Sequence, residues 1–286
     1  MAGIPDHFDF PPDFFALDPM PTSVDPSPTA ADPSHATVDP SNLANDAAVA
    51  DSAVIDDRSA SIAMLGWPEL AAQVASCQRC GLCRGRVKTV FGVGDVHATW
   101  LFIGEGPGYY ENQQGEPFVG RAGQLLDNML SALGVVRGDR AYIANIVKCR
   151  PTDANGKDRP PTPQEVAACL PYLQRQIALI QPQVIVALGK TAVTSLFGLD
   201  PQIPLAQLRG KVMHYHHPPT DTELPISPAP GAARTDGTQG RGAGGTAAPI
   251  PLVATYHPAY LLRQPSDKRK AWADLCLARQ QIPPTE

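Results

Sequence analysis

Short runs of uninterrupted apolar residues alternate along the chain with stretches in which apolar residues recur at helical spacing. The runs predict buried strands, and the periodic stretches predict helices that place one face on a sheet. Strands are expected at 99–103, 141–147, 183–188, 211–215 and 252–256, with a short further one at 88–91. Helices are expected at 67–80, 124–133, 162–180, 190–197 and 266–280. This alternation predicts an α/β domain built on a mostly parallel sheet.

The glycine-rich stretch 104–123 joins the strand at 99–103 to the helix at 124–133. In open α/β sheets, the loops that follow the carboxyl ends of strands are where ligands bind. Two of the carboxylates in this loop, Glu105 and Glu111, flank Pro107 and Gly108. The loop is therefore the first candidate for a functional site, although carboxylates on a surface loop are often only solvated.

Two phosphate-binding motifs are excluded. A dinucleotide-binding fingerprint that starts at Gly104 would need glycine at position 109, where this chain has Tyr109. The run Gly189-Lys-Thr191 resembles the end of a phosphate-binding loop, but that loop would need glycine at position 184, which is Val184. We interpret Gly189-Lys-Thr191 as a plain turn between a strand and a helix.

Composition divides the chain into a tail, a domain and an insertion. Residues 1–60 contain eleven Asp, no Glu and one basic residue, and they are rich in Pro, which predicts a disordered acidic tail. A Pro- and Gly-rich stretch at 217–249 predicts a flexible insertion within a folded domain at 61–286. The aromatic and acidic segment 8–15 could dock on a protein partner, and an incidental patch is the alternative.

Charge and hydropathy narrow the class of protein. A net charge of −5 for the chain and −10 for residues 1–60 leaves +5 for the remainder, which suits a domain that approaches a polyanion. The first residues lack the basic and apolar regions of a secretory signal, and no apolar run is long enough to span a bilayer. We therefore expect a cytoplasmic protein that does not enter the membrane.

The cysteines suggest a metal centre. Cys77 and Cys80 form a Cys-x-x-Cys pair, and Cys149 and Cys169 are two further candidates from a separate part of the chain. Four thiolates of this kind could hold zinc or an iron–sulfur cluster, and spacing does not choose between them. Two cysteines are left over, Cys83 and Cys276. Both are interpreted as small buried hydrophobes, with Cys83 the stronger rival ligand.

Four stretches resemble the family-4 uracil-DNA glycosylases, the iron–sulfur branch of that superfamily. They are Gly104-Glu-Gly-Pro-Gly-Tyr-Tyr-Glu111, Gly115-Glu-Pro-Phe-Val-Gly-Arg-Ala-Gly-Gln-Leu-Leu126, Asn145-Ile-Val-Lys-Cys-Arg-Pro151 and Tyr256-His-Pro-Ala-Tyr-Leu-Leu-Arg263. Together and in this order they are specific, whereas none is specific alone. The chain departs from the family at Asn112, where the family usually has Asp, and in a slightly longer gap between Cys149 and Cys169.

The resemblance implies a three-layer α/β/α fold and an enzyme that hydrolyses the N-glycosidic bond of uracil in DNA, the first step of base excision repair. It also implies a [4Fe–4S] cluster held by Cys77, Cys80, Cys149 and Cys169, and a monomer whose partner is uracil-containing DNA. Two rival functions stay open. One is a non-catalytic iron–sulfur or zinc module that binds nucleic acid, and the other is a hydrolase of another substrate.

The resemblance also implies which residues bind the base. Phe118 matches the family's stacking aromatic, and Asn145 matches the amide that reads uracil, since an amide can pair with both O4 and N3–H. The backbone of Glu105 and Gly106 is expected to line the pocket. Alone, Phe118 would be interpreted as a core residue and Asn145 as a buried turn residue.

For the chemistry, the resemblance places His257 as the donor to uracil O2, where negative charge develops as the bond breaks. Glu105 and Glu111 are expected to stabilise the cationic sugar or to orient the attacking water, with exclusion of thymine's methyl group as an alternative for Glu111. Leu261, Leu262 and Arg263 are expected to contact DNA as an apolar wedge and a cation. The alternatives are a structural His and a leucine that packs in the core.

Overall fold

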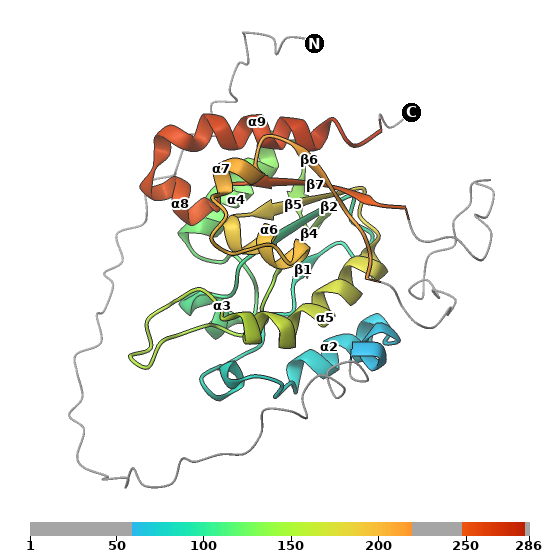
Figure 1. Cartoon of the computed structure of the whole chain (residues 1–286), viewed down its shortest axis with the longest axis vertical. Helices are drawn as coiled ribbons and strands as arrows, with labels where there is room; N and C mark the ends of the chain where they lie inside the picture. Colours follow the sequence, from blue (N-terminus) through green and yellow to red (C-terminus); the bar gives the residue numbers. More distant parts are fainter. Residues whose placement is uncertain (1–58, 219–247, 284–286) are drawn as a thin grey trace, which may run out of the picture.

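The computed structural model describes residues 59–218 and 248–283 (Figure 1). Residues 1–58 of the predicted tail and residues 219–247 of the predicted insertion lie outside the described residues, so both assignments stay predictions. No helix within the described ranges has both the length and the apolar character needed to cross a membrane.

The strands form one mixed sheet in the order β1-β4-β2-β5-β7-β6, with β3 paired to β4. Their bounds are β1 Val93–Gly94, β2 Trp100–Gly104, β3 Val136–Arg137, β4 Arg140–Asn145, β5 Val184–Leu188, β6 Val212–Tyr215 and β7 Ile250–Thr255. The four central strands β4, β2, β5 and β7 are parallel to one another, whereas β1 and β6 pair antiparallel at the two edges. The prediction of a mostly parallel sheet is confirmed.

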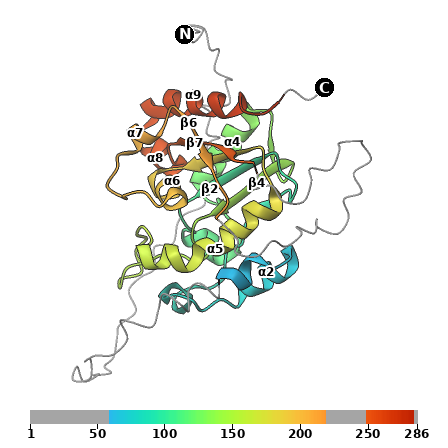
Figure 2. The ribbon, with the colours of Figure 1, turned by 45° about the vertical axis from the view of Figure 1, so that its right-hand side comes forward.

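Helices cover both faces of the sheet, which confirms the three layers (Figures 1 and 2). One face packs against α2 Trp67–Ala75, α5 Pro163–Ile180 and α6 Lys190–Phe197. The other packs against α4 Arg121–Ala132, α8 Pro258–Arg263 and α9 Lys268–Arg279. Shorter elements are α3 Tyr109–Gln114, α7 Leu205–Leu208 and the 3-10 turns η2 Gly81–Arg84 and η3 Pro265–Asp267.

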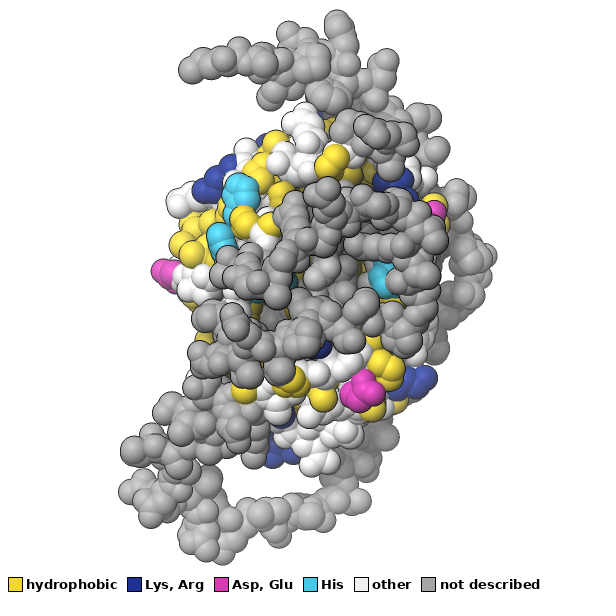
Figure 3. All heavy atoms as spheres, turned by 90° about the vertical axis from the view of Figure 1, so that its right-hand side faces the viewer, with side chains coloured by type: hydrophobic (Ala, Val, Ile, Leu, Met, Phe, Trp, Pro, Cys, Tyr) yellow, Lys and Arg dark blue, Asp and Glu magenta, His cyan; other side chains and the backbone are white. Residues whose placement is uncertain are grey.

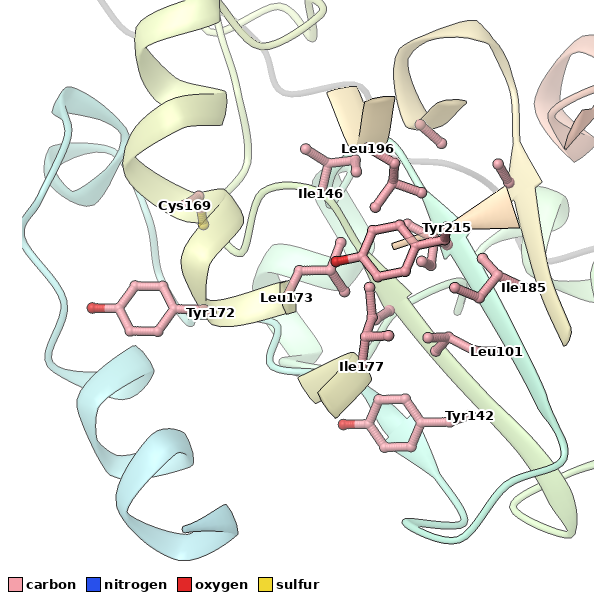
Figure 4. Packing of buried hydrophobic residues seen from close by; sticks show 14 of the residues in the cluster. Leu101, Tyr142, Ile146, Cys169, Tyr172, Leu173, Ile177, Ile185, Leu196 and Tyr215 are labelled. Carbon is pink, nitrogen blue, oxygen red and sulfur yellow. The ribbon is translucent and has the colours of Figure 1, made fainter. Parts of the chain in front are cut away.

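The central strands are buried on both sides because their side chains alternate between the two layers. In β2, Leu101 and Ile103 belong to the core beneath α5, while Trp100 and Phe102 belong to the core beneath α4 and α9. Figure 4 shows the first of these cores, where Leu101 lies among residues of α5 and neighbouring strands. Continuous apolar runs in the sequence therefore correspond to strands with two buried faces.

The start of α5 is confirmed in detail. The Thr162 hydroxyl accepts from the Glu165 N–H at 3.2 Å, and the Glu165 carboxylate accepts from the Thr162 N–H at 2.8 Å. Pro163 occupies the first turn, where its missing N–H costs nothing. Arg159 also pairs with Glu165 at 2.6 Å, so this helix start is tied to the preceding loop.

Several predicted boundaries were wrong. The helix predicted at 67–80 ends at Ala75, so Cys77 and Cys80 lie beyond it. The segment 88–91 is not a strand, and the antiparallel edge is formed instead by β1 at Val93–Gly94. The strand predicted to reach 147 ends at Asn145.

Two short helices were missed because their starts carry unusual caps. None of the predicted helices covers residues 257–263, but α8 begins there with the His257 ring as its cap. Within the glycine-rich loop, α3 begins after Gly108, whose N–H donates to Glu111 at 3.1 Å. Neither His nor Gly is a leading N-cap residue, so a search for Ser, Thr, Asn or Asp caps does not find these helices.

Candidate active site and cysteine cluster

The predicted base-binding residues come from the ends of adjacent parallel strands. Gly104 ends β2 opposite Asn145, the last residue of β4. Gly189 follows β5, and its N–H donates at 2.8 Å to the carbonyl of Thr255, the last residue of β7. Glu105 therefore follows β2 and His257 follows β7, with β5 between these two strands. Because carboxyl ends of parallel strands meet at one edge, the sheet brings these residues together.

Phe118, Asn145 and His257 converge beside Glu105. A Cβ on Gly104, the residue before Glu105, would lie 2.4 Å from Asn145 Oδ1 and 2.7 Å from Phe118 Cζ. The Phe118 and His257 rings are stacked, with centroids 5.4 Å apart and an interplanar angle of 28°. Glycine at position 104 is therefore required for the amide and the aromatic ring to meet.

Phe118 is held in a strained backbone conformation. Its φ is +55°, a value that L-residues other than Asn and Asp rarely adopt. Arg137 of β3 holds the strained segment, because its guanidinium donates to the carbonyls of Pro117 and Phe118, each at 2.9 Å. Arg137 also pairs with Asp127 at 2.9 Å. Backbone strain that the surroundings maintain is typical of functional sites.

We expect Arg137→Met to raise KM for a uracil-containing oligonucleotide about tenfold, since both carbonyls lose a charged donor and the Phe118 ring loses its fixed position. The change in kcat should be smaller. Steady-state kinetics on one oligonucleotide measure both constants. Asp127→Asn is the matched control, because it removes the partner of Arg137 and keeps both carbonyl contacts; a control as impaired as Arg137→Met would contradict the positioning role.

His257 is oriented by its own helix. Its Nδ1 accepts from the Ala259 N–H at 3.1 Å, so the neutral ring carries its proton on Nε2. Desolvation, with a further contribution from Arg263, lowers the pKa of His257 to about 4. The ring is therefore neutral at neutral pH and can donate one hydrogen bond from Nε2. Gly189 makes room for it, since a Cβ there would lie 3.2 Å from the Cβ of His257.

The lowered pKa of His257 predicts a loss of stability in mild acid. The unfolded chain binds a proton at this ring near pH 6.5, whereas the folded chain does not until about pH 4. The neutral ring therefore makes its full contribution to the free energy of unfolding above about pH 6.5, and this contribution is lost as the pH falls toward 4. We expect the free energy of unfolding to fall by about 2 kcal/mol over this range, allowing for solvent screening at a half-buried ring. Urea unfolding of wild type and His257→Gln at pH 7.5 and 4.5 measures this difference, and parallel curves would contradict it.

Asn145 carries an unsatisfied acceptor. Its side chain is 2% exposed, and Oδ1 is buried with no hydrogen-bond partner in the described part of the chain. A buried polar atom left unpaired costs free energy, so such an atom beside other candidate site residues indicates a missing ligand group. Lys148 holds the same residue from behind, because its Nζ donates to the Asn145 carbonyl at 3.0 Å and to Gln176 Oε1 at 2.6 Å.

Glu105 directly follows Gly104, and its carboxylate is held by α6. The Thr191 hydroxyl donates to its Oε2 at 2.5 Å, which fixes one oxygen and leaves the other without a bond in the described residues. Desolvation raises the pKa of Glu105, and the bond from Thr191 opposes that increase. At Gly106, a Cβ would lie 2.8 Å from Val147 Cγ2, so the backbone approaches its neighbour closely.

Glu111 is occupied by the loop itself. Its carboxylate accepts from the N–H groups of Gly108 at 3.1 Å, Val119 at 3.0 Å and Gly120 at 3.3 Å. These bonds tie the start of α3 to the segment that follows Phe118. The geometry gives Glu111 an organising role in the loop, in contrast to the more open carboxylate of Glu105.

The three residues expected to contact DNA differ in exposure. Leu261 is fully buried in the core beneath α4, so its side chain cannot reach a ligand at the surface. Leu262 is half-buried and Arg263 is exposed. Arg263 also lies near enough to His257 to influence its pKa. The end of α8 therefore presents one apolar side chain and one cation beside the pocket.

The four candidate metal ligands line one cavity between α2, η2 and α5. Cys77, Cys80, Cys149 and Cys169 all face it, and so does Cys83. Figure 4 shows Cys169 on α5. Burial raises the pKa of Cys80 and Cys149, and the charge of nearby Cys77 raises both further. Cys276, on α9, does not line this cavity.

Donors and cations surround these thiols. Arg86 donates to Cys149 Sγ at 3.6 Å and to the Cys77 carbonyl, and the Lys148 N–H donates to Cys169 Sγ at 3.2 Å. Within residues 59–218 and 248–283, no three or more His, Cys, Asp or Glu side chains are arranged to hold a single metal ion. A cluster of several iron atoms is wider than one ion, so its ligands lie farther apart. The thiol set with its N–H and guanidinium donors fits such a cluster.

Sequence reasoning missed the residues that position the site. Two of them, Arg137 and Lys148, donate to the backbone carbonyl of a site residue. The third, Thr191, donates to Glu105, which is far from it in the sequence. Lys148 lies within a stretch that carried the resemblance, so attention to its charge could have found it. Arg137 and Thr191 have no such signal, because their roles depend on the fold.

Comparison with known proteins assigns the chain to a family. The model of the uracil-DNA glycosylase superfamily matches residues 91–277. Several relatives carry the name type-4 uracil-DNA glycosylase, and three of them follow. That of Pyrobaculum aerophilum is 36% identical over 206 residues, 71% of this chain and 88% of its own length. That of Thermotoga maritima is 37% identical over 196 residues, which are 68% of this chain and 83% of the relative's own length. That of Archaeoglobus fulgidus is 42% identical over 146 residues, which are 50% of this chain and 71% of the relative's own length.

Proposed function

Because the chain belongs to the type-4 group of the uracil-DNA glycosylase superfamily, we propose that the pocket at Phe118, Asn145 and His257 removes uracil from DNA and so begins base excision repair. A base inside a duplex is out of reach, so the nucleotide must first leave the stack. The pocket at the carboxyl edge of the sheet accepts the extruded base.

The unpaired Oδ1 of Asn145 is the observation that carries this proposal. Uracil N3–H donates to that oxygen, and the amide nitrogen donates to uracil O4. Cytosine presents an acceptor at N3 and a donor at its amino group, so it would leave both amide atoms unpaired. The penalty for buried unpaired groups gives selectivity for uracil. The Phe118 ring supplies a flat surface on which the base stacks.

Breaking the bond between the sugar and uracil N1 leaves negative charge on uracil O2 and positive charge on the sugar. The Nε2–H of His257 donates to O2 as that charge develops, and a neutral ring suits this role because it keeps its proton. The carboxylate of Glu105 faces the cationic sugar or the attacking water, with one oxygen free for either. We assign Glu111 to holding the loop and the backbone of Gly106 to lining the pocket.

The cysteine cavity holds a [4Fe–4S] cluster in this proposal, with Cys77, Cys80, Cys149 and Cys169 as ligands. A bound cluster supplies cross-links between segments that are far apart in sequence, and the residues here take no part in bond cleavage. Arg86 and the Lys148 N–H stabilise thiolate charge. A brown protein with broad visible absorption supports this assignment, while a colourless protein that contains zinc overturns it.

DNA binding is assigned to Leu262 and Arg263 beside the pocket, with Leu261 as their buried support. On the face that Figure 3 shows, Lys and Arg side chains lie at several separate places and not in one broad patch. The monomeric state, the cytoplasmic location and a protein partner for the tail at 1–60 stay predictions.

The test is incubation of the protein with a uracil-containing oligonucleotide, followed by alkali. Release of uracil leaves an abasic site, which alkali converts into a strand break. A break at the uracil position, and none in a matched thymine oligonucleotide, is expected. Tight binding of the oligonucleotide without a break would favour the rival function, a non-catalytic module that binds nucleic acid.

A further inference from the structure

Two adjacent tyrosines at the start of α3 have no role in the site described so far. Tyr109 is 53% exposed and Tyr110 is 54% exposed. Of the large hydrophobic side chains exposed in the described part of the chain, only these two are aromatic. Their rings meet edge to face, with centroids 5.4 Å apart and an interplanar angle of 85°.

The pair is fixed in place beside the uracil pocket. A Cβ on Gly120 would lie 3.7 Å from Tyr110 Cδ2, so this ring borders the segment that follows Phe118. Glu111, the next residue, is bound to the Val119 and Gly120 N–H groups. The tyrosines are therefore attached to the same loop that presents the stacking ring of the pocket, and their exposure is built into a rigid element.

Cations accompany the rings. The Arg150 guanidinium lies over the Tyr109 ring, 5.2 Å from its centroid. It also pairs with Asp158 at 2.6 Å, so its charge is partly compensated. Arg121, the first residue of α4, is exposed and has no ion-pair partner among the described residues. Exposed aromatic rings beside cations are the combination by which proteins bind unpaired nucleic-acid strands.

We propose that Tyr109 and Tyr110 form an aromatic platform in which one ring stacks on a base that flanks the extruded uracil on the same strand, while the other ring supports it edge-on. This inference rests on the proposed function, because extruding one nucleotide leaves its neighbours without a stacking partner. An aromatic face replaces that partner, and it does so for any base.

The experiment measures binding of a single-stranded oligonucleotide in which a non-cleavable 2′-fluoro-deoxyuridine is flanked, on one side at a time, by fluorescent 2-aminopurine. Wild type should quench 2-aminopurine on at least one side. Stacking of one base corresponds to roughly 5- to 150-fold in affinity. The double variant Tyr109→Leu/Tyr110→Leu should bind the strand at least tenfold more weakly and lose the quenching. The Phe/Phe variant should stay within about twofold of wild type.

Two controls separate the possible outcomes. Met64→Ala removes another exposed hydrophobe and should change nothing, and Tyr110→Leu alone replaces the double variant if that chain does not fold. At saturating substrate, the Leu pair should release uracil within about threefold of the wild-type rate. Wild-type affinity and quenching in the Leu pair, with uracil release intact, would overturn the platform alone. A wild-type protein that releases no uracil would overturn the proposed function instead.

Discussion

Replacing His257 with alanine should lower the rate of uracil release about 100-fold while leaving the fold and the affinity for DNA nearly unchanged. The ring donates to an oxygen on which charge appears only as the bond breaks, so its loss affects the transition state more than the bound ground state. One preorganised donor to a developing oxyanion contributes roughly 3 kcal/mol, which corresponds to this factor.

Single-turnover release of uracil from an oligonucleotide measures this effect, and titration of a non-cleavable oligonucleotide measures binding. His214→Ala is the matched control, because His214 is an exposed histidine on the edge strand β6. In wild type, the acid limb due to His257 should appear near pH 4, since burial lowers the pKa of the ring to about 4. A rate for His257→Ala equal to that of the control would remove the histidine from the mechanism.

The parts of the fold that the sequence predicts well are those that burial dictates. Strands such as β2 and β5 are apolar along their whole length because both faces pack on helices, and this pattern has few competing interpretations. The helix α5 has a standard start at Thr162, Pro163 and Glu165. Short elements are harder, since α3 and α8 have six residues each and depend on contacts that only the fold creates.

The candidate site divides in the same way. Residues that contact the base, such as Phe118 and Asn145, lie in stretches with a specific resemblance, so the sequence indicates them and the fold brings them together. Residues that hold them in place are different. Arg137 reaches the Phe118 carbonyl from nineteen residues away, and it matters because Phe118 has a φ of +55°. A backbone angle of this kind leaves no signal in residue types.

The structure also separates residues of the same type that the sequence predictions treated alike. Positions 261 and 262 are both leucine, and both side chains were expected to contact DNA. In α8, the Leu261 side chain is fully buried under α4 while Leu262 is only half-buried at the margin of the same core, because successive helical residues point about 100° apart. Glu105 and Glu111 differ in a similar way, since one keeps a free oxygen and the other is bound by three N–H groups.

Replacing Cys149 with serine should remove the visible absorption of the purified protein and lower its Tm by about 10 °C. Cys149 is buried and follows the segment that carries Asn145, so losing its bond to the proposed cluster is expected to release both the cluster and the strand end that carries Asn145. Loss of a bound metal centre is among the changes that cost several kcal/mol, and roughly 3 kcal/mol corresponds to this shift in a domain of this size.

Two other cysteines make this prediction specific. Cys83 lines the same cavity as Cys149, whereas Cys276 lies on α9 outside it. Cys276→Ser should keep the absorption and the Tm, and Cys83→Ser should keep both if the four ligands are Cys77, Cys80, Cys149 and Cys169. Iron and sulfide content, measured beside the spectrum, identifies the centre independently of activity. If Cys83→Ser lost the visible absorption and Cys149→Ser kept it, the result would contradict this ligand set. Cys83 would then be the fourth ligand in place of Cys149.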